Sequence, residues 1–297
     1  MNVTKDGFKD RQLHIEDYLQ MVSAEQKEYA EVSAHQRIAE NNDIITDFQT
    51  DNLMEQILHK DNLNKAYKKV KSNKGAGEVD GMSVDELLGF LRDNQKQLIQ
   101  QIKDGKYKPN PVRRVEIPKE TKGEFRKLGV PTVVDRVFQQ AITQVLSPIY
   151  EKQFSENSFG FQPNRGAHDA LKQCQTNVND GYVYVVDMDL EKFFDTVSQS
   201  KLIEVLSRTI KDGRVISLIH KYLNAGVISR GMFEKTAVGM PQGGPLSPLL
   251  SDIMLNEMDK ELTRRGHRFV RYADDCMIFC KSRKSAERTL ENIVPYI

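Results

Sequence analysis

The chain of 297 residues contains no tryptophan and only three cysteines, and its formal net charge is just +1. Cys174, Cys276 and Cys280 form no C-x-x-C pair, and their odd number argues against a disulfide framework. No apolar run approaches the roughly 20 residues that cross a membrane, and the first residues lack the apolar core of a signal peptide. These absences exclude a disulfide-stabilised secreted scaffold and favour a reducing, cytoplasmic location with no membrane partner.

The small net charge conceals an uneven distribution along the chain. Residues 1–60 carry 12 acidic and 6 basic side chains, so the other 237 residues carry a balance of +7. Residues 103–136 contain 10 basic and 5 acidic side chains. A local basic excess suits a polyanionic partner such as nucleic acid, although a solvated basic surface is the simpler explanation of this pattern taken alone.

Apolar spacing and the positions of proline and glycine predict a mainly helical first half. Residues 12–60 have helical spacing and contain neither proline nor glycine. A glycine-rich loop is expected at 73–81. The helix that follows begins with Ser83 and, three residues later, Glu86, which is the pattern of a capping box. Residues 107–132 are rich in proline and glycine and predict short strands and turns.

The second half is expected to place helices around apolar strands. A helix should run from residue 133 to near Pro148, and a pair of helices over 199–226 should break at residues 212–213. The segment "GMPQGGPLSPLLSDIMLNEMDKEL" predicts a tight loop that leads into a helix. Residues 183–186 are all apolar or aromatic and predict a buried strand.

Two adjacent carboxylates, Asp274 and Asp275, stand between two apolar runs in "RFVRYADDCMIFC". Both runs are rich in β-branched and aromatic side chains, which predicts a hairpin with the acidic pair at its turn. Most adjacent acidic pairs only decorate a solvated turn. In a hairpin packed into a sheet, however, like charges held close together raise each other's pKa unless a cation intervenes. Carboxylate oxygens are natural ligands for a hard divalent ion.

A further pair of carboxylates lies in "VYVVDMDLEKFFDTV". Asp187 and Asp189 end the apolar strand, and strand alternation places both on one side if the extended form persists. A strand-end aspartate beside an acidic hairpin is the pattern of a two-metal nucleotidyl-transfer site, where one ion activates a hydroxyl and the other holds the leaving phosphates. Mg²⁺ suits such a site because it takes few carboxylates and shares substrate phosphates; Mn²⁺ could replace it.

The motif "YADD" in an apolar hairpin resembles the catalytic motif of reverse transcriptases, and its surroundings resemble the group II intron-encoded reverse transcriptases (maturases). The other matching segments, in chain order, are "NKGAGEVDG", "RRVEIPK" with "FRKLGVPT", "SFGFQPNRGAHDAL" and "GMPQGGPLSPLLSDIMLNEMD". The resemblance covers roughly residues 50–290. The alanine of "YADD" differs from the methionine of retroviral enzymes. The "NKGAGEVDG" segment and the N-terminal extension favour the intron type over retron and diversity-generating enzymes.

The resemblance implies catalytic and metal-binding roles for Asp189, Asp274 and Asp275. In the family, an aspartate is followed after four residues by an aromatic residue and a second aspartate, and "DLEKFFD" fits this pattern from Asp189 rather than Asp187. The aromatic position is then Phe194, which the resemblance implies crowds the sugar 2′ position and rejects ribonucleotides. The alternatives are core packing for Phe194 and a strand-end hydrogen-bond acceptor for Asp187.

The resemblance also implies contacts with the incoming dNTP. Lys119 and Arg126 stand where the family's fingers hold the triphosphate, and an ammonium and a guanidinium fork suit phosphate oxygens. Gln242 matches a position that contacts the nucleotide, and Gly243 and Gly244 would let the backbone approach its sugar and base. The alternatives are solvated hairpin charges for the first two and a plain helix-entry turn for the glutamine segment.

Three arginines are candidates for contacts with nucleic acid. Arg165 in "PNRGAH" is a candidate for template phosphates, although a simple loop charge explains it nearly as well. Arg113 and Arg114 lie in the basic stretch 103–136. His168 has no cysteine or carboxylate partner at ligand spacing and is expected to be structural.

We therefore expect an α+β fold, namely the fingers and palm of a right-hand polymerase, with a small antiparallel palm sheet packed with helices. The expected domains are a helical N-terminal extension (1–60), fingers (61–178) and palm (179–297). Full-length members of the family continue into a thumb, a maturase domain and sometimes an endonuclease, so a truncated chain is expected. A surface left by a missing thumb could promote a homodimer.

The expected function is RNA-directed DNA synthesis for a group II intron, with two Mg²⁺ ions supporting transfer of a dNTP to a primer 3′-hydroxyl. The expected partners are an RNA template, the intron RNA, a DNA primer or target, and dNTPs. The alternative is an RNA-binding splicing cofactor, a maturase fragment that recognises folded intron RNA by shape and phosphate contacts and has no polymerase activity of its own. The sequence leaves the cognate intron and target site open.

Overall fold

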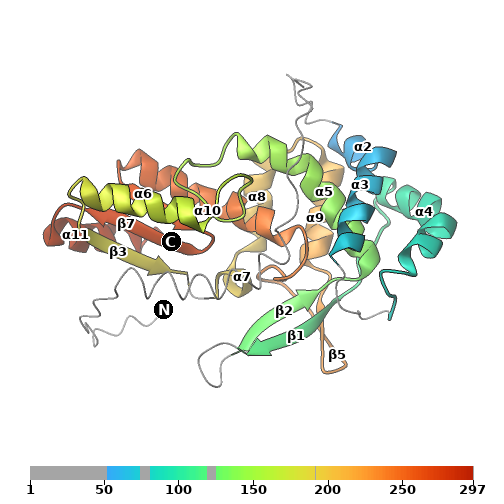
Figure 1. Ribbon diagram of the computed structural model, residues 1–297. Helices are drawn as coiled ribbons and strands as arrows, with labels where there is room; N and C mark the ends of the chain where they lie inside the picture. The colour runs from blue at the N-terminus through green and yellow to red at the C-terminus, as the bar shows by residue number, and fades with distance from the viewer. Residues whose placement is uncertain (1–51, 74–80, 119–124, 191, 297) are drawn as a thin grey trace. The chain divides into compact units, whose positions relative to one another are not determined.

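The computed structural model describes residues 52–73, 81–118, 125–190 and 192–296, in which helices alternate with two small sheets (Figure 1). The helices are α2 (Leu53–Ile57), α3 (Lys60–Ser72), α4 (Leu87–Lys103), α5 (Val133–Glu151), α6 (Ala167–Asn179), α7 (Phe193–Thr196), α8 (Gln199–Thr209), α9 (Gly213–Leu223), α10 (Ser247–Arg264) and α11 (Arg283–Ile293). The strands are β1 (Val112–Pro118), β2 (Phe125–Val130), β3 (Tyr184–Asp189), β4 (Val227–Ser229), β5 (Met232–Glu234), β6 (Arg268–Tyr272) and β7 (Asp275–Cys280).

Polar side chains fix the starts of several helices. Thr132 caps α5 by accepting a hydrogen bond from the Asp135 amide, and Ser282 caps α11 in the same manner. The predicted capping box before α4 forms, because the amide and hydroxyl of Ser83 both donate to the Glu86 carboxylate at 2.8 Å. Such caps satisfy amides that the first turn of a helix leaves unpaired.

Two predicted helix boundaries have different outcomes. The break expected at residues 212–213 is confirmed, because α8 ends at Thr209 and the Asp212 side chain caps the start of α9. The end expected near Pro148 falls at Glu151, because α5 continues through the proline. The last turn persists because Ile149 and Tyr150 are buried in the helical core. Their burial outweighs the one intrahelical hydrogen bond that a proline removes.

The first sheet has the strand order β2-β1-β4-β5. The strands and turns predicted for 107–132 are confirmed as the antiparallel hairpin of β1 and β2, in which Arg114 lies opposite Gly129. β4 joins β1 in parallel and continues into β5 through a turn where Arg230 and Gly231 have φ values of 50° and 78°. This second hairpin was not predicted, because its strands have only three residues each.

The second sheet has the order β3-β7-β6, and both of its strand pairs are antiparallel. Met258 and Leu262 of α10 and Ile293 of α11 pack against side chains of all three strands and cover one face. Ala170 of α6 packs against Val270 of β6 on the opposite face. Figure 1 shows α6, α10 and α11 around this sheet. The small antiparallel sheet packed with helices is therefore confirmed.

β3 lies at the edge of this sheet. Val183, Tyr184 and Val185 expose 59%, 42% and 43% of their surface, while Val186 is buried. The prediction of a buried strand at 183–186 is therefore wrong for the first three residues. The reason is the strand order, which puts β7 in the centre and leaves β3 with a single neighbouring strand.

The main core is helical and extends from α2 to α10. α5 contacts α2, α3 and α10, and its Ile142 and Leu146 are fully buried, as are Leu53 of α2 and Leu206 of α8. All described residues belong to one compact unit, Thr46–Ile297. No helix in the described part of the chain is long and apolar enough to cross a membrane.

The structure covers only part of two predicted segments. The helical prediction for 12–60 is confirmed where α2 and the start of α3 are described, and residues 1–51 lie outside the described part. Residues 74–80 of the glycine-rich segment also lie outside it. The three domain boundaries stay a prediction.

Candidate active site

The hairpin of β6 and β7 brings the two adjacent carboxylates to a tight turn. Tyr272 pairs with Asp275, so Ala273 and Asp274 are the only residues between the paired positions. Ala273 has a φ of 55°, a conformation that few non-glycine residues adopt. The predicted hairpin is therefore confirmed, and its turn contains a backbone conformation that its surroundings must hold in place.

The register of β3 on β7 places Asp189 directly opposite Asp275. Because opposite residues of an antiparallel pair point to the same face, these two side chains share a face. Asp187 lies two residues earlier on the same face, opposite Met277, and is exposed like Asp189. Val186 and Met188, which alternate with them, are buried. The expected alternation of the strand is thus confirmed.

The carboxylates influence one another electrostatically. Asp274 is half-buried, and the pKa of its carboxyl lies above the usual value. Burial is the main cause and the charge of Asp189 adds to it, whereas the charges of Arg126 and Arg271 lower the pKa. The pKa of Asp187 is also raised, by partial desolvation first and by Asp189 second. Mutual repulsion of this kind is relieved by a bound cation.

The donor chemistry of this face fits a divalent cation. Carboxylate oxygens are the ligands that Mg²⁺ prefers, and Cβ atoms of directly opposed residues such as Asp189 and Asp275 lie about 4.5–5.5 Å apart. Within the described ranges, no three His, Cys, Asp or Glu side chains converge closely enough to hold a metal ion together. The backbone register of Asp189 and Asp275 and the type of donor they supply fit such an ion.

One of the two predicted triphosphate contacts, Arg126, lies on β2. Arg126 is half-buried on β2, opposite Ile117, and its charge reaches Asp274 strongly enough to lower the pKa of that carboxyl. The structure therefore brings a basic side chain of the first sheet near the carboxylates of the second. Lys119 lies outside the described residues.

Phe194 is held by the loop that contains the predicted glutamine. Its half-buried ring meets that of Phe193 edge to face, with centroids 5.5 Å apart. Its carbonyl accepts a hydrogen bond of 2.7 Å from the Met240 amide, and the Gly239 amide donates to Val197 at 2.9 Å. The residue predicted at the sugar position is thus fixed through its backbone to the loop two residues before Gln242.

The Gln242 loop also contacts the first sheet. The Gln242 carbonyl accepts a 2.6 Å hydrogen bond from the Gly129 amide of β2. A Cβ on Gly243 would lie 3.1 Å from the Gly129 carbonyl, and one on Gly244 would lie 2.4 Å from Gln139 Oε1. Gly243 also has a φ of 123°, a conformation that favours glycine, whereas a side chain at position 244 would require the Gln139 amide to move. The loop joins the sheet of β1 and β2 to the segment that carries Phe194.

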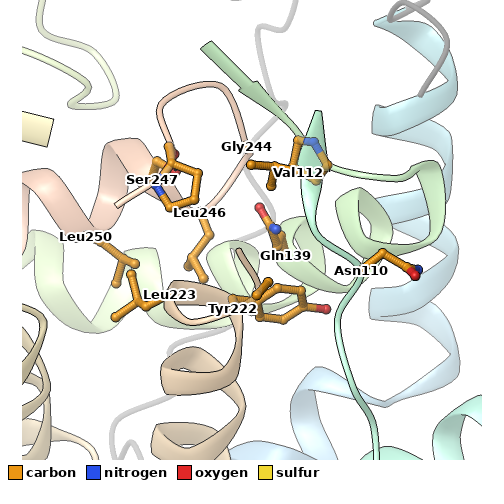
Figure 2. Close-up of a pocket in the computed structure, with 12 residues that line it drawn as sticks. Asn110, Val112, Gln139, Tyr222, Leu223, Gly244, Leu246, Ser247 and Leu250 are labelled. Carbon is orange, nitrogen blue, oxygen red and sulfur yellow. The ribbon is translucent and has the colours of Figure 1, made fainter. Parts of the chain in front are cut away.

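A small cavity lies behind this loop (Figure 2). Its volume is about 20 Å³, room for about one water molecule. Figure 2 shows the Gln139 amide directed toward Gly244, with Tyr222 and Leu246 on either side. The cavity is too small for a nucleotide.

The predicted nucleic-acid contacts are separated by the structure. Arg113 and Arg114 are neighbours on β1, so their side chains point to opposite faces of the hairpin. Arg165 donates from Nη1 to the carbonyls of Ser155 and Ser158, both at 2.8 Å. The Arg165 guanidinium therefore supports the loop before α6, and its role toward nucleic acid stays a prediction.

The sequence analysis missed a buried arginine beside the carboxylates. Arg271 of β6 has no exposed side-chain surface and forms ion pairs with Asp252 and Asp259 of α10. A charged residue within the apolar run before "YADD" was the available signal. The two aspartates lie seven residues apart on the expected helix and so share one of its faces.

Comparison with known proteins identifies the family. Residues 117–296 match the family described as reverse transcriptase (RNA-dependent DNA polymerase). The chain belongs to this family. It is 38% identical over 236 residues to the group II intron-encoded protein LtrA of Lactococcus lactis subsp. cremoris, which covers 80% of this chain and 39% of LtrA. The resemblance to group II intron-encoded reverse transcriptases is confirmed.

A second relative and a solved structure agree with this assignment. Protein YkfC of Escherichia coli (strain K12) is 40% identical over 200 residues, 65% of this chain and 52% of YkfC. This chain therefore spans about two fifths of the length of LtrA and about half of the length of YkfC. A chain of a partial Cas6-RT-Cas1–Cas2 complex matches with a TM-score of 0.52 and 22% identity over 87% of this chain and 44% of that one. This likeness confirms the α+β fold of polymerase fingers and palm.

Proposed function

We propose that this reverse transcriptase family chain synthesises DNA on an RNA template by adding dNTPs to a primer 3′-hydroxyl. The observation that carries the proposal is the cross-strand register of Asp189 and Asp275, with Asp274 in the adjoining turn. Three carboxylates on one end of a small sheet are the arrangement required for nucleotidyl transfer supported by divalent ions.

Asp189, Asp274 and Asp275 would hold two Mg²⁺ ions, with Mn²⁺ as a substitute. When bound, such ions supply activation of the primer hydroxyl and charge neutralisation at the phosphates. The chain's own contribution is the placement of these carboxylates on paired strands, so that little reorganisation is needed during the reaction. Asp187 is the alternative ligand on β3, because it lies on the same face of the strand as Asp189.

The dNTP would lie between β2 and the loop before α10. Arg126 and Lys119 would contact its phosphates, Gln242 its base or sugar, and Phe194 would exclude a 2′-hydroxyl. Two contacts support this placement: the charge of Arg126 reaches Asp274, and the Gln242 loop is hydrogen-bonded to both Phe194 and β2. Excluding a hydroxyl requires a rigid pocket wall, and the backbone bonds of the loop supply rigidity.

The partners proposed are an RNA template, a DNA primer or target, and the RNA of a group II intron. The similarity to the group II intron-encoded protein LtrA supports the last of these. Arg113, Arg114 and Arg165 are the proposed contacts with nucleic acid. We further propose the division into extension (1–60), fingers (61–178) and palm (179–297), a cytoplasmic location and a possible homodimer.

A splicing role without DNA synthesis is the second candidate function. Similarity to the nuclear intron maturase 2 of Arabidopsis thaliana, 37% identical over 95 residues, favours it for a part of the chain. Filter binding with intron RNA distinguishes the roles. Binding that survives Asp274→Asn but falls in an Arg113→Gln, Arg114→Gln double variant supports RNA recognition independent of catalysis. Equal affinity for unrelated RNA contradicts the splicing role.

Primer extension tests the proposed polymerase activity. The purified chain is given an RNA template, a DNA primer, Mg²⁺ and dNTPs, and is compared with Asp275→Asn. Loss of one metal-ligating carboxylate should reduce extension by at least about 100-fold. Asp93→Asn, which changes an exposed carboxylate on α4, is the matched control and should extend normally. Absence of extension by the unaltered chain, or full activity of Asp275→Asn, would overturn the proposal.

A further inference from the structure

We infer that Arg271 is a positioning residue. It holds the turn of Ala273 and Asp274 in place by linking this turn to the segment before α6. The inference rests on the proposed function, because it concerns the placement of the proposed metal-binding carboxylates. It extends that function to a buried side chain that does not touch substrate.

All five N–H donors of Arg271 have partners. Nε and Nη2 form a bidentate contact with the Asp259 carboxylate at 2.8 and 2.7 Å, and Nη1 donates to Asp252 at 3.1 Å. The remaining two donors reach Ser158 Oγ at 2.7 Å and the Ala273 carbonyl at 2.8 Å. A planar fork with every donor satisfied has one low-energy orientation, so its position fixes the position of the Ala273 carbonyl.

The backbone of Arg271 is held as tightly as its side chain. Its amide donates to the Asn157 carbonyl at 2.8 Å, and its carbonyl accepts from the Phe159 amide at 2.9 Å. The Asn157–Phe159 stretch therefore adds to the free edge of β6. The segment that carries Ser158 and the strand that carries the turn form one hydrogen-bonded unit.

Gly160 completes this unit through a close backbone approach. A Cβ at this position would lie 2.1 Å from the Ala273 amide nitrogen and 2.8 Å from its Cα. No side chain fits there without displacement of the turn. The turn is therefore fixed from two sides: Arg271 holds the carbonyl of Ala273, and Gly160 packs against its amide.

These contacts act on geometry rather than on net stability. Buried ion pairs are often replaceable by apolar residues without loss of stability, so stability alone does not account for a five-bond arginine. Ala273 has a positive φ and directly precedes Asp274. Release of its carbonyl would let the turn relax and would move Asp274 relative to Asp189 across the sheet. Arg271 therefore determines the position of the Asp274 carboxylate relative to that of Asp189.

Two variants separate the turn from the charge network. Arg271→Lys keeps a positive charge beside Asp252 and Asp259 but cannot form the fork that also reaches Ala273. Gly160→Ala leaves all five arginine bonds available and displaces the turn directly. Gly89→Ala, at a helical glycine with open space around its Cα, is the matched control. Ser158→Ala removes one bond, retains both ion pairs and is the mildest change.

The measurements are single-turnover primer extension, Mn²⁺ binding followed by electron paramagnetic resonance, and thermal unfolding. We expect Arg271→Lys and Gly160→Ala to lose roughly 10–100-fold in extension rate and in Mn²⁺ affinity per folded molecule, as changes around metal ligands typically do. Extension should be partly restored at high Mn²⁺ concentration. Ser158→Ala should show a smaller loss of the same kind, and Gly89→Ala should match the unaltered chain.

A purely structural role predicts another outcome. Unfolding temperatures would fall while the extension rate and Mn²⁺ affinity of the folded fraction stayed at the unaltered level, and that result would overturn the inference. If Arg271→Lys does not fold, Gly160→Ala and Ser158→Ala decide the question. If the unaltered chain neither binds Mn²⁺ nor extends a primer, the proposed function fails and this inference fails with it. If the unaltered chain binds Mn²⁺ and extends a primer, and the variants match it in both measurements, this inference alone fails.

Discussion

Replacing Gly239 with alanine should impair nucleotide use through the contact between the glutamine loop and Phe194. Gly239 has a φ of 79°, and a Cβ there would lie 2.7 Å from the Phe194 carbonyl oxygen and 2.8 Å from that of Asp195. The left-handed backbone alone costs an alanine roughly 1–2 kcal/mol. The contact adds a displacement, because backbone oxygens must move away from the new methyl group.

The size of the effect follows from that displacement. A misplacement of about 1 Å can cost about 100-fold in rate, so a shift of about half that size should cost about tenfold. This loss corresponds to about 1.4 kcal/mol in kcat/KM for dNTP. The loop also bears Gln242, so the loss should appear mainly as a higher KM for dNTP.

A matched control isolates the contact from the backbone strain. Gly231 has a φ of 78°, and a Cβ there would meet nothing within 4 Å. Gly231→Ala should therefore lose only the roughly 1–2 kcal/mol of the left-handed backbone in thermal unfolding and keep its kcat/KM in primer extension. Equal kcat/KM in the Gly231→Ala and Gly239→Ala variants would refute the argument that the loop positions Phe194 and Gln242 together.

Two further predictions concern charge and capping. Arg126→Gln removes a positive charge that lowers the pKa of the Asp274 carboxyl, so this pKa should rise further above its usual value. The acidic limb of the pH–rate profile for extension should therefore move to higher pH. A profile measured at saturating dNTP checks this, and a limb that stays in place or moves to lower pH contradicts it. Asp212→Ala removes the cap of α9 and leaves the buried Met54 amide without its 3.0 Å acceptor, so urea unfolding should show a loss of roughly 2–4 kcal/mol. Ser198→Ala, which removes a helix cap and an exposed hydrogen bond with the Ser200 hydroxyl, should lose about 1 kcal/mol, and equal losses in the two variants would contradict the added cost of the Met54 amide.

Local patterns in the sequence were sufficient to predict the candidate carboxylates. Alternation in 183–189 correctly placed Asp187 and Asp189 on one side, and the apolar runs around Asp274 predicted the hairpin. These features depend on a strand period of two residues. The helix break at residues 212–213 likewise depends on short-range backbone preferences.

Other features depended on neighbours that sequence patterns do not identify. The exposure of Val183 and Val185 follows from the strand order, which places β7 between β3 and β6. The continuation of α5 past Pro148 follows from the burial of Ile149 and Tyr150 in the core. Long-range packing overrides a local helix-breaking preference in that case.

The buried arginine shows the same limit at the candidate site. Its partners lie in α10 and in the segment before α6, at sequence separations of 12 to 113 residues. A charge in an apolar strand indicates that a buried partner must exist. It does not indicate which residue the partner is, and only the assembled fold brings Ser158 and Asp259 to Arg271.

The central claim is that Asp189, with Asp274 and Asp275, supports DNA synthesis by this chain. The most direct test compares single-nucleotide extension by the unaltered chain, Asp189→Asn and Asp187→Asn on one RNA template, with Mg²⁺ varied. The account predicts that Asp189→Asn abolishes extension at every Mg²⁺ concentration, whereas Asp187→Asn retains most of it. Extension that survives in Asp189→Asn and disappears in Asp187→Asn would contradict the assignment, and extension that survives in both would contradict a carboxylate site on β3.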